Sequence, residues 1–380
     1  MPRKFADGRI RTVTSGEIMS DGTFEVPVGP LHVALEEPMY FKVDVDGDTI
    51  RDVDIIAGHL HRGIEQIATN RNFFQCIVLT ERLCSLCSNS HPSTYCMAIE
   101  DIAGIELPPR AKYIRVVTEE IKRIASNMFN VGLLAHLVGF DTLFMQIMEI
   151  RETMQDIKEV VYGNRMNLGA NVIGGVRVDF DGSKIAYLRH RLGVIKPQLQ
   201  EMLKFMETNR SIARRSKGVG VLSHDQAIMQ GVVGPVARAS GVMNDVRVDA
   251  PYAAFPELEV ETHSANDGDV FSRAMIRFRE ALTAIDIIFQ CLDKLPSGPI
   301  ALGYMPHIPA GEAVSRTEAP RGELIYYLRT DGSDRPERIK WRVPSYPNWE
   351  ALRLMLRGAD IADATIIIGS IDPCIACTER

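Results

Sequence analysis

Four of the seven cysteines form two Cys-x-x-Cys pairs at opposite ends of the chain. The first pair is Cys84 and Cys87, and the second is Cys374 and Cys377. Cysteines separated by two residues can turn both sulfurs toward one metal ion, so the two pairs supply four soft thiolate ligands. Taken alone, this pattern is typical of a structural zinc ion or an iron–sulfur cluster. Zinc ribbons join their pairs by short loops, however, whereas nearly the whole chain separates these two pairs. The predicted site therefore connects the two ends of a large protein.

The other three cysteines stand alone in the sequence. Cys76 and Cys96 flank the first pair too loosely for a common cluster spacing, and Cys291 is far from both pairs. Cysteine is among the residue types most often found in protein cores, so we expect these three to be packing residues. The odd total also argues against a disulfide framework.

The composition is that of an ordinary globular chain. The 380 residues are 46% hydrophobic and 24% charged, which excludes a disordered or fibrous protein. The formal net charge of -6 and the short basic runs give no electrostatic reason to expect a nucleic-acid partner. No stretch approaches the roughly 18 uncharged apolar residues of a membrane-spanning helix, and the N-terminal segment lacks the apolar core of a secretory signal. We therefore expect a soluble chain.

Alternating hydrophobic residues and turn residues predict several β elements. Residues 41–45 alternate ahead of an Asp-Gly turn, and residues 50–55 roughly resume the pattern, as in a β-hairpin. Residues 324–329 and 339–343 flank a second turn and predict a second hairpin. A β-branched run at residues 364–368 predicts a short buried strand that leads into the second cysteine pair.

Helical periodicity dominates the middle of the chain. Residues 111–196 contain no proline, and apolar or small residues recur there at three- and four-residue steps, for example from Ile121 to Ala135. This pattern predicts long helices, and residues 271–295 return to it. The intervening segment 219–256 is rich in Gly and Pro and predicts loops with short elements.

These patterns together predict a mainly α (α+β) fold. A bundle of long helices forms the expected core, with small N-terminal and C-terminal β-hairpins added to it. The sequence shows no internal repeat or clear linker, so we expect residues 1–380 to form one unit. Within it, residues 1–60 are the predicted β-rich part, 61–317 the helical core, and 318–380 the C-terminal hairpin with the second cysteine pair.

Both cysteine pairs lie in longer motifs that are similar to those of a known family. Residues 81–91 contain the pattern R-x-C-x-x-C-x-x-x-H, which resembles the N-terminal signature of NiFe hydrogenase large subunits. Residues 372–380 resemble the C-terminal signature of the same subunits. Further similar segments run along the whole chain, at residues 29–32, 61–65, 231–235 and 318–322.

The resemblance is strongest toward the membrane-bound, energy-converting (group 4) NiFe hydrogenases. Their large subunits are also similar to the quinone-site, 49-kDa-type subunit of complex I, and segments such as 238–247 and 327–336 are common to both groups. The quinone-site relatives lack the four thiolates. Their Ser-His pair and Asp on the long helix are here Ser126-Asn127 and Leu137. These differences favour a hydrogenase; the alternatives are a quinone-site-type subunit without NiFe catalysis and a scaffold with a structural zinc.

The resemblance implies a ligand set and a reaction. Cys84 and Cys374 would be terminal ligands of nickel, and Cys87 and Cys377 would bridge nickel to an iron that carries carbon monoxide and cyanide. The implied reaction is the reversible heterolytic cleavage of H2, or proton reduction in the other direction. The metal centre would act as the Lewis acid and the Cys374 thiolate as the base.

Three further residues have implied roles at this centre. Arg321, in a Glu-Ala-Pro-Arg-Gly turn, would place a permanent positive charge over the open site. Glu65 matches a glutamate that relays protons from the terminal cysteine. His91 would donate a hydrogen bond to a bridging sulfur and so tune its basicity.

Two more expectations concern charged residues. Arg82, two residues before the first pair, would bind near the cofactor and help to neutralise the site. Glu36 or Glu37 would hold a Mg²⁺ or iron ion near the C-terminus of the chain, and the resemblance does not choose between them.

The electrons of such a reaction need a second polypeptide, because this chain has no further cysteine set for an iron–sulfur cluster. The resemblance implies a small subunit with a 4Fe–4S cluster, then a ferredoxin-like iron–sulfur subunit and soluble ferredoxin. It also implies complex I-like membrane antiporter subunits that couple the current to H⁺ or Na⁺ translocation. We therefore expect a peripheral subunit on the cytoplasmic side of the cell membrane.

Overall fold

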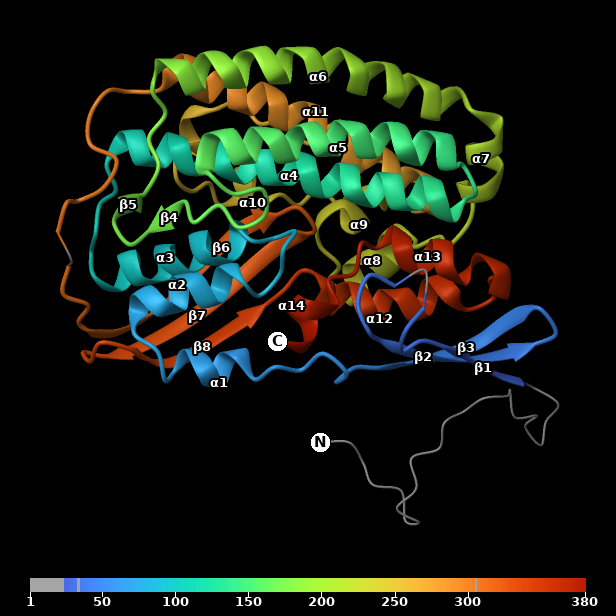
Figure 1. Cartoon of the computed structure of the whole chain (residues 1–380). Coiled ribbons are helices and arrows are strands. Elements are labelled where there is room, and N and C mark those ends of the chain that lie inside the picture. The colour runs from blue at the N-terminus through green and yellow to red at the C-terminus, as the bar shows by residue number, and fades with distance from the viewer. Residues whose placement is uncertain (1–23, 33–34, 305) are drawn as a thin grey trace, which may run out of the picture.

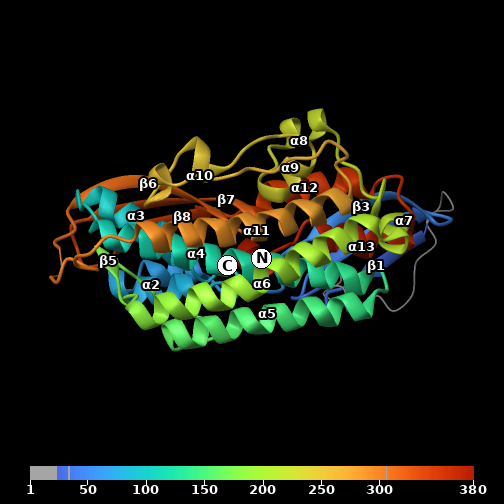
Figure 2. The same cartoon turned by 90° about the horizontal axis from the view of Figure 1, so that it is seen from above.

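The computed structural model describes residues 24–32, 35–304 and 306–380. In this part of the chain, four long helices lie side by side, and the sheets and shorter helices pack beneath them in the view of Figure 1. Figure 2, seen from above, shows the four running along the long dimension of the molecule. They are α4 (Pro109–Leu137), α5 (Asp141–Tyr162), α6 (Gly182–Thr208) and α11 (Val270–Lys294). The prediction of long helices in the middle of the chain is confirmed.

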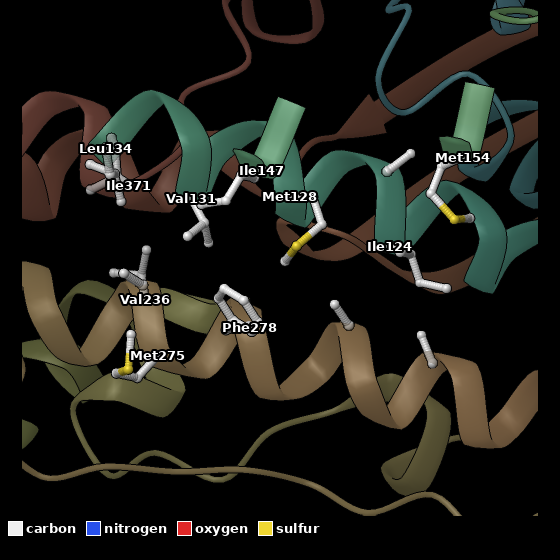
Figure 3. Close-up of a cluster of buried hydrophobic side chains, with 14 of the residues drawn as sticks. Ile124, Met128, Val131, Leu134, Ile147, Met154, Val236, Met275, Phe278 and Ile371 are labelled. Atoms are coloured by element: carbon white, nitrogen blue, oxygen red, sulfur yellow. The ribbon is translucent and has the colours of Figure 1, made fainter. Parts of the chain in front are cut away.

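Helix α4 lies at the centre and packs against both α5 and α11. Met128 of α4 and Phe278 of α11 face each other across a core from which solvent is excluded (Figure 3). Burying an apolar side chain of this size contributes about 1.5–3 kcal/mol, so this seam is a major part of the stability. On the other side, Gly132 allows a close approach of α5, because a Cβ there would lie 2.4 Å from the Met148 Cε.

The buried surface of α4 also carries charges. Arg115, Glu119, Glu120, Lys122 and Arg123 are each at most 3% exposed. Buried charges are costly unless they are paired or hydrogen-bonded, so these residues must have partners on the elements around α4. Several of those partners lie near the cysteines and Arg321: Glu119 accepts from Ser90, Lys122 donates to the Ser85 carbonyl oxygen, and Arg123 donates to the Glu318 carbonyl oxygen.

The N-terminal sheet contains the first predicted hairpin and one further strand. β2 (Tyr40–Asp46) and β3 (Thr49–Ile56) form the hairpin, and β1 (Phe24–Val28) pairs antiparallel with β2. The inward-facing Phe41 packs its ring against Trp349 of α12 (Ser345–Leu356), with ring centroids 6.0 Å apart. This contact joins the N-terminal sheet to the C-terminal helices.

The C-terminal sheet is larger than predicted. β7 (Gly322–Asp331) and β8 (Pro336–Arg342) form the second predicted hairpin, but β6 (Ala310–Ala319) pairs with the other edge of β7. Residue 317, the last of the predicted helical core, lies inside β6. The buried face of β6 consists of small and polar side chains, Ala313, Ser315 and Thr317, so the hydrophobic alternation that marks a strand is weak.

The predicted strand at residues 364–368 was also wrong. This run belongs to helix α13 (Ala364–Ser370), and Ile366, Ile367 and Ile368 are all buried. α13 packs against α4, α11 and α12, so its isoleucines find apolar neighbours on every side. A short apolar run that is buried on all sides has no periodicity with which to separate a helix from a strand.

The remaining helices and strands are short. Residues 219–256 contain three short helices and one turn of 3-10 helix among loops, as predicted. The bounds of the short elements not yet given are α1 (Ile64–Ala68), α2 (Phe73–Glu81), α3 (Ser90–Ile102), β4 (Asn171–Val172), β5 (Gly175–Val176), α7 (Arg210–Ser216), α8 (His224–Gln230), α9 (Gly234–Ala239), α10 (Val246–Asp249), η1 (Phe255–Glu257), η2 (Ile361–Asp363) and α14 (Ile375–Glu379).

Two expectations from composition can be compared with the described residues. None of the helices in residues 24–32, 35–304 and 306–380 has the length and hydropathy needed to span a membrane. Cys76, Cys96 and Cys291 are free thiols with 0% exposure, as expected of packing residues.

Candidate metal centre

The fold brings the two Cys-x-x-Cys pairs together in the interior. The first pair lies in the turn between α2 and α3, and the second lies where α14 begins after α13. The sulfurs of Cys84 and Cys374 are 3.4 Å apart although 290 residues separate them in the chain. The sulfurs of Cys84, Cys374 and Cys377 all lie within 4.8 Å of one another. Cys87 is next to them, because its backbone nitrogen lies 3.4 Å from the Cys84 sulfur. All four cysteines are buried free thiols.

Two basic residues that the motifs did not single out fix these loops. Arg62 Nη2 donates to the carbonyl oxygens of Leu83, at 2.8 Å, and Ala376, at 3.1 Å, so one guanidinium connects both cysteine loops. Lys122 of α4 donates through Nζ to the Ser85 carbonyl oxygen, inside the first pair, at 2.9 Å. Arg62 lies within the segment 61–65 that resembles the family motif, which was the available signal for its role.

His91 contacts the second pair from the first turn of α3. Its Nε2 lies 3.3 Å from the Cys377 sulfur, and its Nδ1 lies 2.8 Å from the Tyr326 hydroxyl. Burial lowers the pKa of His91 to about 4, so the ring is neutral near pH 7. A neutral ring with its proton on Nε2 donates to the sulfur and accepts from Tyr326, which satisfies both contacts.

Arg321 lies in the turn between β6 and β7 and points at the first pair. Its Nη1 is 3.0 Å from the Cys87 sulfur. Its Nε and Nη2 donate, both at 2.7 Å, to the carbonyl oxygen and to Oδ1 of Asp372. Arg321 is 2% exposed, so its charge acts on the sulfurs with little screening by solvent.

Asp372, which immediately precedes Pro373 and Cys374, was not identified from the sequence. Its φ of 55° places it in the left-handed region, which Asp tolerates better than most residues. This conformation presents both a backbone and a side-chain oxygen to Arg321. The ion pair thereby connects the Arg321 turn to the loop that carries Cys374.

The four thiols fit a thiophilic cation. In this buried site they cannot all ionise without one: hydrogen bonds with the neighbouring cysteines lower the pKa of Cys84, whereas burial raises the pKa of Cys377. A metal ion bound to all four sulfurs removes this conflict, because it stabilises every thiolate at once. The donor set therefore suits nickel, iron or zinc better than a hard, oxygen-preferring ion.

Glu65, a residue of α1, is half-buried. It pairs with Lys340 and with the Arg380 Nε, 2.8 Å away, and its described hydrogen bonds do not include any of the four cysteines. Burial opposes ionisation, but the hydrogen bonds from Lys340 and Arg380 outweigh it and lower the pKa of Glu65. These contacts hold Glu65 between two basic side chains, one of which is the last residue of the described chain.

Glu36 and Glu37 are neighbours in the N-terminal part of the chain, and Glu37 contacts the second cysteine loop. Glu37 Oε2 accepts a hydrogen bond from the Ala376 backbone N–H at 2.5 Å. Glu36 is solvent-exposed, and desolvation by the surrounding chain and then the charge of Asp372 raise its pKa to about 8. The charges of Arg321 and Cys84 also act on Glu36, so Glu36 lies within electrostatic range of the sulfur cluster.

Arg82 is exposed at the end of α2, and its side chain makes no hydrogen bond or ion pair to the site in the described residues. The structure thus brings together the four cysteines, His91 and Arg321, while Arg82 and Glu65 lie outside this group. Arg62, Lys122 and Asp372 join this group through hydrogen bonds.

A cleft of about 480 Å³ opens to solvent next to the second pair. Its lining includes Glu65, Lys340, Tyr346 and residues 378–380, which directly follow Cys377. The lining of the cleft therefore includes the residue that directly follows Cys377 in α14.

Known proteins are similar to this chain over nearly its whole length. The family described as the nickel-dependent hydrogenases matches residues 62–141, which include the first cysteine pair and His91. The family described as the 49 kDa subunit of the respiratory-chain NADH dehydrogenase matches residues 138–306 and 303–380. A carbon monoxide-induced hydrogenase of Rhodospirillum rubrum is 59% identical over 94% of this chain and 99% of the relative. The chain belongs to the nickel-dependent hydrogenase family, in the branch shared with the 49-kDa subunit of complex I.

Other members of this hydrogenase family come from membrane complexes. The membrane-bound hydrogenase subunit alpha of Pyrococcus furiosus is 36% identical over 94% of this chain and 87% of the relative. A chain in the structure of the membrane-bound sulfane sulfur reductase, an archaeal respiratory membrane complex, superposes with a TM-score of 0.90. It is 31% identical and covers 95% of this chain and 100% of that chain. Because relatives with different reactions share one fold, the cysteine site rather than the fold indicates the reaction.

Proposed function

We propose that this chain is the catalytic subunit of an energy-converting NiFe hydrogenase, which interconverts H2 with protons and electrons. The observation that carries the proposal is the convergence of four buried thiols from the two ends of the chain, with the Arg321 guanidinium 3.0 Å from one of them. A quinone-site subunit without metal has no need of this donor set.

The four sulfurs divide into two kinds of ligand in this proposal. Cys84 and Cys374, whose sulfurs are 3.4 Å apart, would hold nickel as terminal ligands, and Cys87 and Cys377 would be shared with an iron that carries carbon monoxide and cyanide. When bound, this centre supplies the Lewis acidity and redox capacity that heterolytic cleavage of H2 requires. The contacts on the two bridging sulfurs support the division, because Arg321 is bonded to Cys87 and His91 to Cys377.

The protein side chains supply charge and proton transfer. Arg321, fixed by Asp372, keeps a permanent positive charge beside the sulfurs and offsets their negative charge. Neutral His91 donates a hydrogen bond to the Cys377 sulfur and lowers its basicity, so a proton is directed to another sulfur. Cys374 is the base in this proposal.

The proton must then leave the sulfur through a carboxyl group, and there are two candidates. Glu65 is the residue that the family resemblance implies, but its ion pairs keep it ionised at the cleft. Glu36 is solvent-exposed, its pKa is raised to about 8, and its charge interacts with those of Asp372 and Cys84. We propose Glu36 as the acceptor, since a carboxyl group with this pKa can take up a proton near pH 7 and release it to water.

Replacing each carboxylate by its amide separates the two candidates. We expect Glu36→Gln to retain nickel but to lose about 100-fold or more of its H2/D2O isotope exchange, because an amide cannot carry the proton. We expect Glu65→Gln to exchange at nearly the normal rate. The opposite pattern would assign the relay to Glu65 and exclude Glu36.

Electrons must leave through a partner protein, because the described cysteines outside the site are isolated core residues. We propose a small subunit with a 4Fe–4S cluster, which approaches at the cleft beside residues 378–380, followed by a ferredoxin-like subunit and soluble ferredoxin. Antiporter-like membrane subunits would couple this current to H⁺ or Na⁺ transport on the cytoplasmic side of the membrane. Membership of the relatives in membrane complexes supports this arrangement.

The ligand assignment is tested by one pair of serine substitutions. We expect Cys374→Ser to abolish isotope exchange, because serine is a poor nickel ligand and a poor base at this site. Cys291→Ser is the matched control: it also changes a buried cysteine, but one in the helical core, so exchange per folded subunit should be unchanged. Exchange that survives in the Cys374 variant would reject the assignment.

A further inference from the structure

The turn that carries Arg321 is held from behind by a second arginine. Arg123 of α4 donates through Nη2 to the Glu318 carbonyl oxygen at 2.5 Å and through Nη1 to the Ala319 carbonyl oxygen at 3.1 Å. These are the last residues of β6, directly before the turn. Arg123 itself is 0% exposed and makes no described contact with the cysteines.

The same turn is confined on its other side by a backbone contact. Gly234, the first residue of α9, has a φ of 68°, and a Cβ there would lie 2.2 Å from the Arg321 carbonyl oxygen. Gly322, with a φ of 124°, meets the Gly234 backbone in return, since its Cβ would lie 2.6 Å from the Gly234 nitrogen. No side chain larger than hydrogen fits between the two segments, so the turn has little freedom to move toward α9.

Arg123 is in turn fixed by a buried array of charges. Its Nε donates to both oxygens of Glu120 on the same helix, at 3.2 and 3.0 Å. Glu120 also accepts from Arg247, and the Glu318 side chain pairs with Arg238 at 3.0 Å. The array therefore fixes both Arg123 and the end of β6, and the turn is a rigid extension of it.

We infer that Arg123 is a positioning residue for Arg321: its bonds to the end of β6, against the Gly234 contact, set where the Arg321 guanidinium lies relative to the cysteine sulfurs. These contacts do not involve the metal centre, and their effect on catalysis rests on the proposed function. An error of about 1 Å in the placement of a group beside a reacting centre can cost about 100-fold in rate, so the device is important to the reaction.

Arg123→Lys keeps the positive charge but loses part of this set of hydrogen bonds. A guanidinium has separate N–H groups for the two carbonyl oxygens and for Glu120, whereas a single ammonium cannot reach all of them in this arrangement. Arg123→Lys therefore loosens the turn without leaving the array short of a positive charge.

Arg115 provides a matched control on the same helix. It is 3% exposed, pairs with both oxygens of Glu100, and donates to the carbonyl oxygens of Val172 and Gly175. Arg115→Lys thus disturbs a buried ion pair and two carbonyl bonds, as Arg123→Lys does, but in a place that does not touch the Arg321 turn.

The test combines Arg123→Lys, Arg321→Lys and Arg115→Lys in the assembled complex. We expect Arg123→Lys to lower H2/D2O exchange by about 10- to 100-fold at normal nickel content. Adding it to Arg321→Lys should produce no further loss, because the residue that it positions is already changed. Arg115→Lys should leave the exchange rate per folded subunit unchanged, whether it is made alone or added to another substitution.

A second measurement does not depend on the metal. Amide hydrogen exchange of residues 319–324 should become at least severalfold faster in Arg123→Lys and stay normal in Arg115→Lys. Unchanged amide exchange in this turn would overturn the inference, as would independent losses in the double variant. If Arg123→Lys fails to assemble while Arg115→Lys assembles, the role is in folding and the inference is also wrong. Absence of nickel from the normal complex would refute the proposed function but leave the amide-exchange result valid.

Discussion

At the residue scale, the site is built from side chains that each make two or three directed contacts. Arg321 bridges Asp372 and Cys87, His91 bridges Tyr326 and Cys377, and each contact fixes the orientation of the next. Because these residues are buried, a lost partner leaves a polar group without hydrogen bonds, which costs more than the bond itself contributes. Single substitutions here should therefore have large and specific effects.

Asp372 allows charge and backbone conformation to be separated. Asp372→Asn keeps a residue that tolerates the left-handed region but removes the charge that pairs with Arg321, and we expect it to cost about 3–5 kcal/mol of stability. Asp372→Ala should cost roughly 1–2 kcal/mol more, because alanine disfavours a φ of 55°. Thermal unfolding of the purified subunit measures both, and equal midpoints for the two variants would contradict the conformational argument.

Glu65 gives a prediction of pH dependence. Its pKa is lowered in the folded state, so its ion pairs stabilise the fold above the ordinary carboxyl pKa of 4.5 and lose this contribution as the pH falls further. Glu65→Gln should therefore unfold at a lower temperature than the normal protein at pH 7, and the difference should shrink below about pH 4.5.

The control for this measurement is an exposed ion pair on the sheet that carries Lys340. Glu337 pairs with Arg329, and both side chains are more than 40% exposed. Glu337→Gln should change the unfolding temperature much less, because solvent screens an exposed pair. Equal effects of the two substitutions would mean that Glu65 is not held as described.

At the element scale, the sequence predicted elements whose hydrophobic pattern is strong and failed where burial is unusual. The long helices and both hairpins follow from periodicity and turn residues. β6 was missed because Ser315 and Thr317 face inward, where their hydroxyls bond to Thr94 of α3. α13 was predicted as a strand because its isoleucines are buried on all sides. In both elements the tertiary contacts, rather than the local pattern, decide the structure.

The packing of α13 can be tested at Ile367, which is 0% exposed. Ile367→Ala should cost about 2–5 kcal/mol, because neighbouring elements close around α13 and a cavity remains. Val314→Ala on β6 is the control, since Val314 is 63% exposed, and it should change stability by about 0.5 kcal/mol or less. Urea unfolding of both variants measures the difference, and a similar small effect at the two positions would contradict the described burial of α13.

At the scale of the whole molecule, the fold brings segments from the first quarter and the end of the described chain together at the site. Residues 60–62 contact residues 376–379, so the first quarter of the chain meets its last residues around the cysteines. Motifs and resemblance predicted the four ligands, His91 and Arg321 from types and spacing. Arg62, Lys122, Asp372 and Arg123 could not be predicted in this way, because their roles depend on carbonyl oxygens and carboxylates that only the folded chain brings near.

The arrangement also relates catalysis to the partner subunits. The second cysteine pair belongs to α14 and its N-cap, and the residues that follow, 378–380, line a cleft that is open to solvent. A partner seated there would bring an electron acceptor near Cys377 without entering the dry site. The other face of the cysteine group is occupied by Arg321 and its turn, which the long helices support.

The metal content of the purified complex tests the central claim most directly. We predict one nickel per catalytic chain, with iron, and infrared bands from carbon monoxide and cyanide bound to that iron. The same measurement on Cys374→Ser should show loss of nickel, and on Cys291→Ser no change. A normal complex that contains zinc or no metal at the four cysteines, without these infrared bands, would contradict the assignment of this chain as a NiFe hydrogenase.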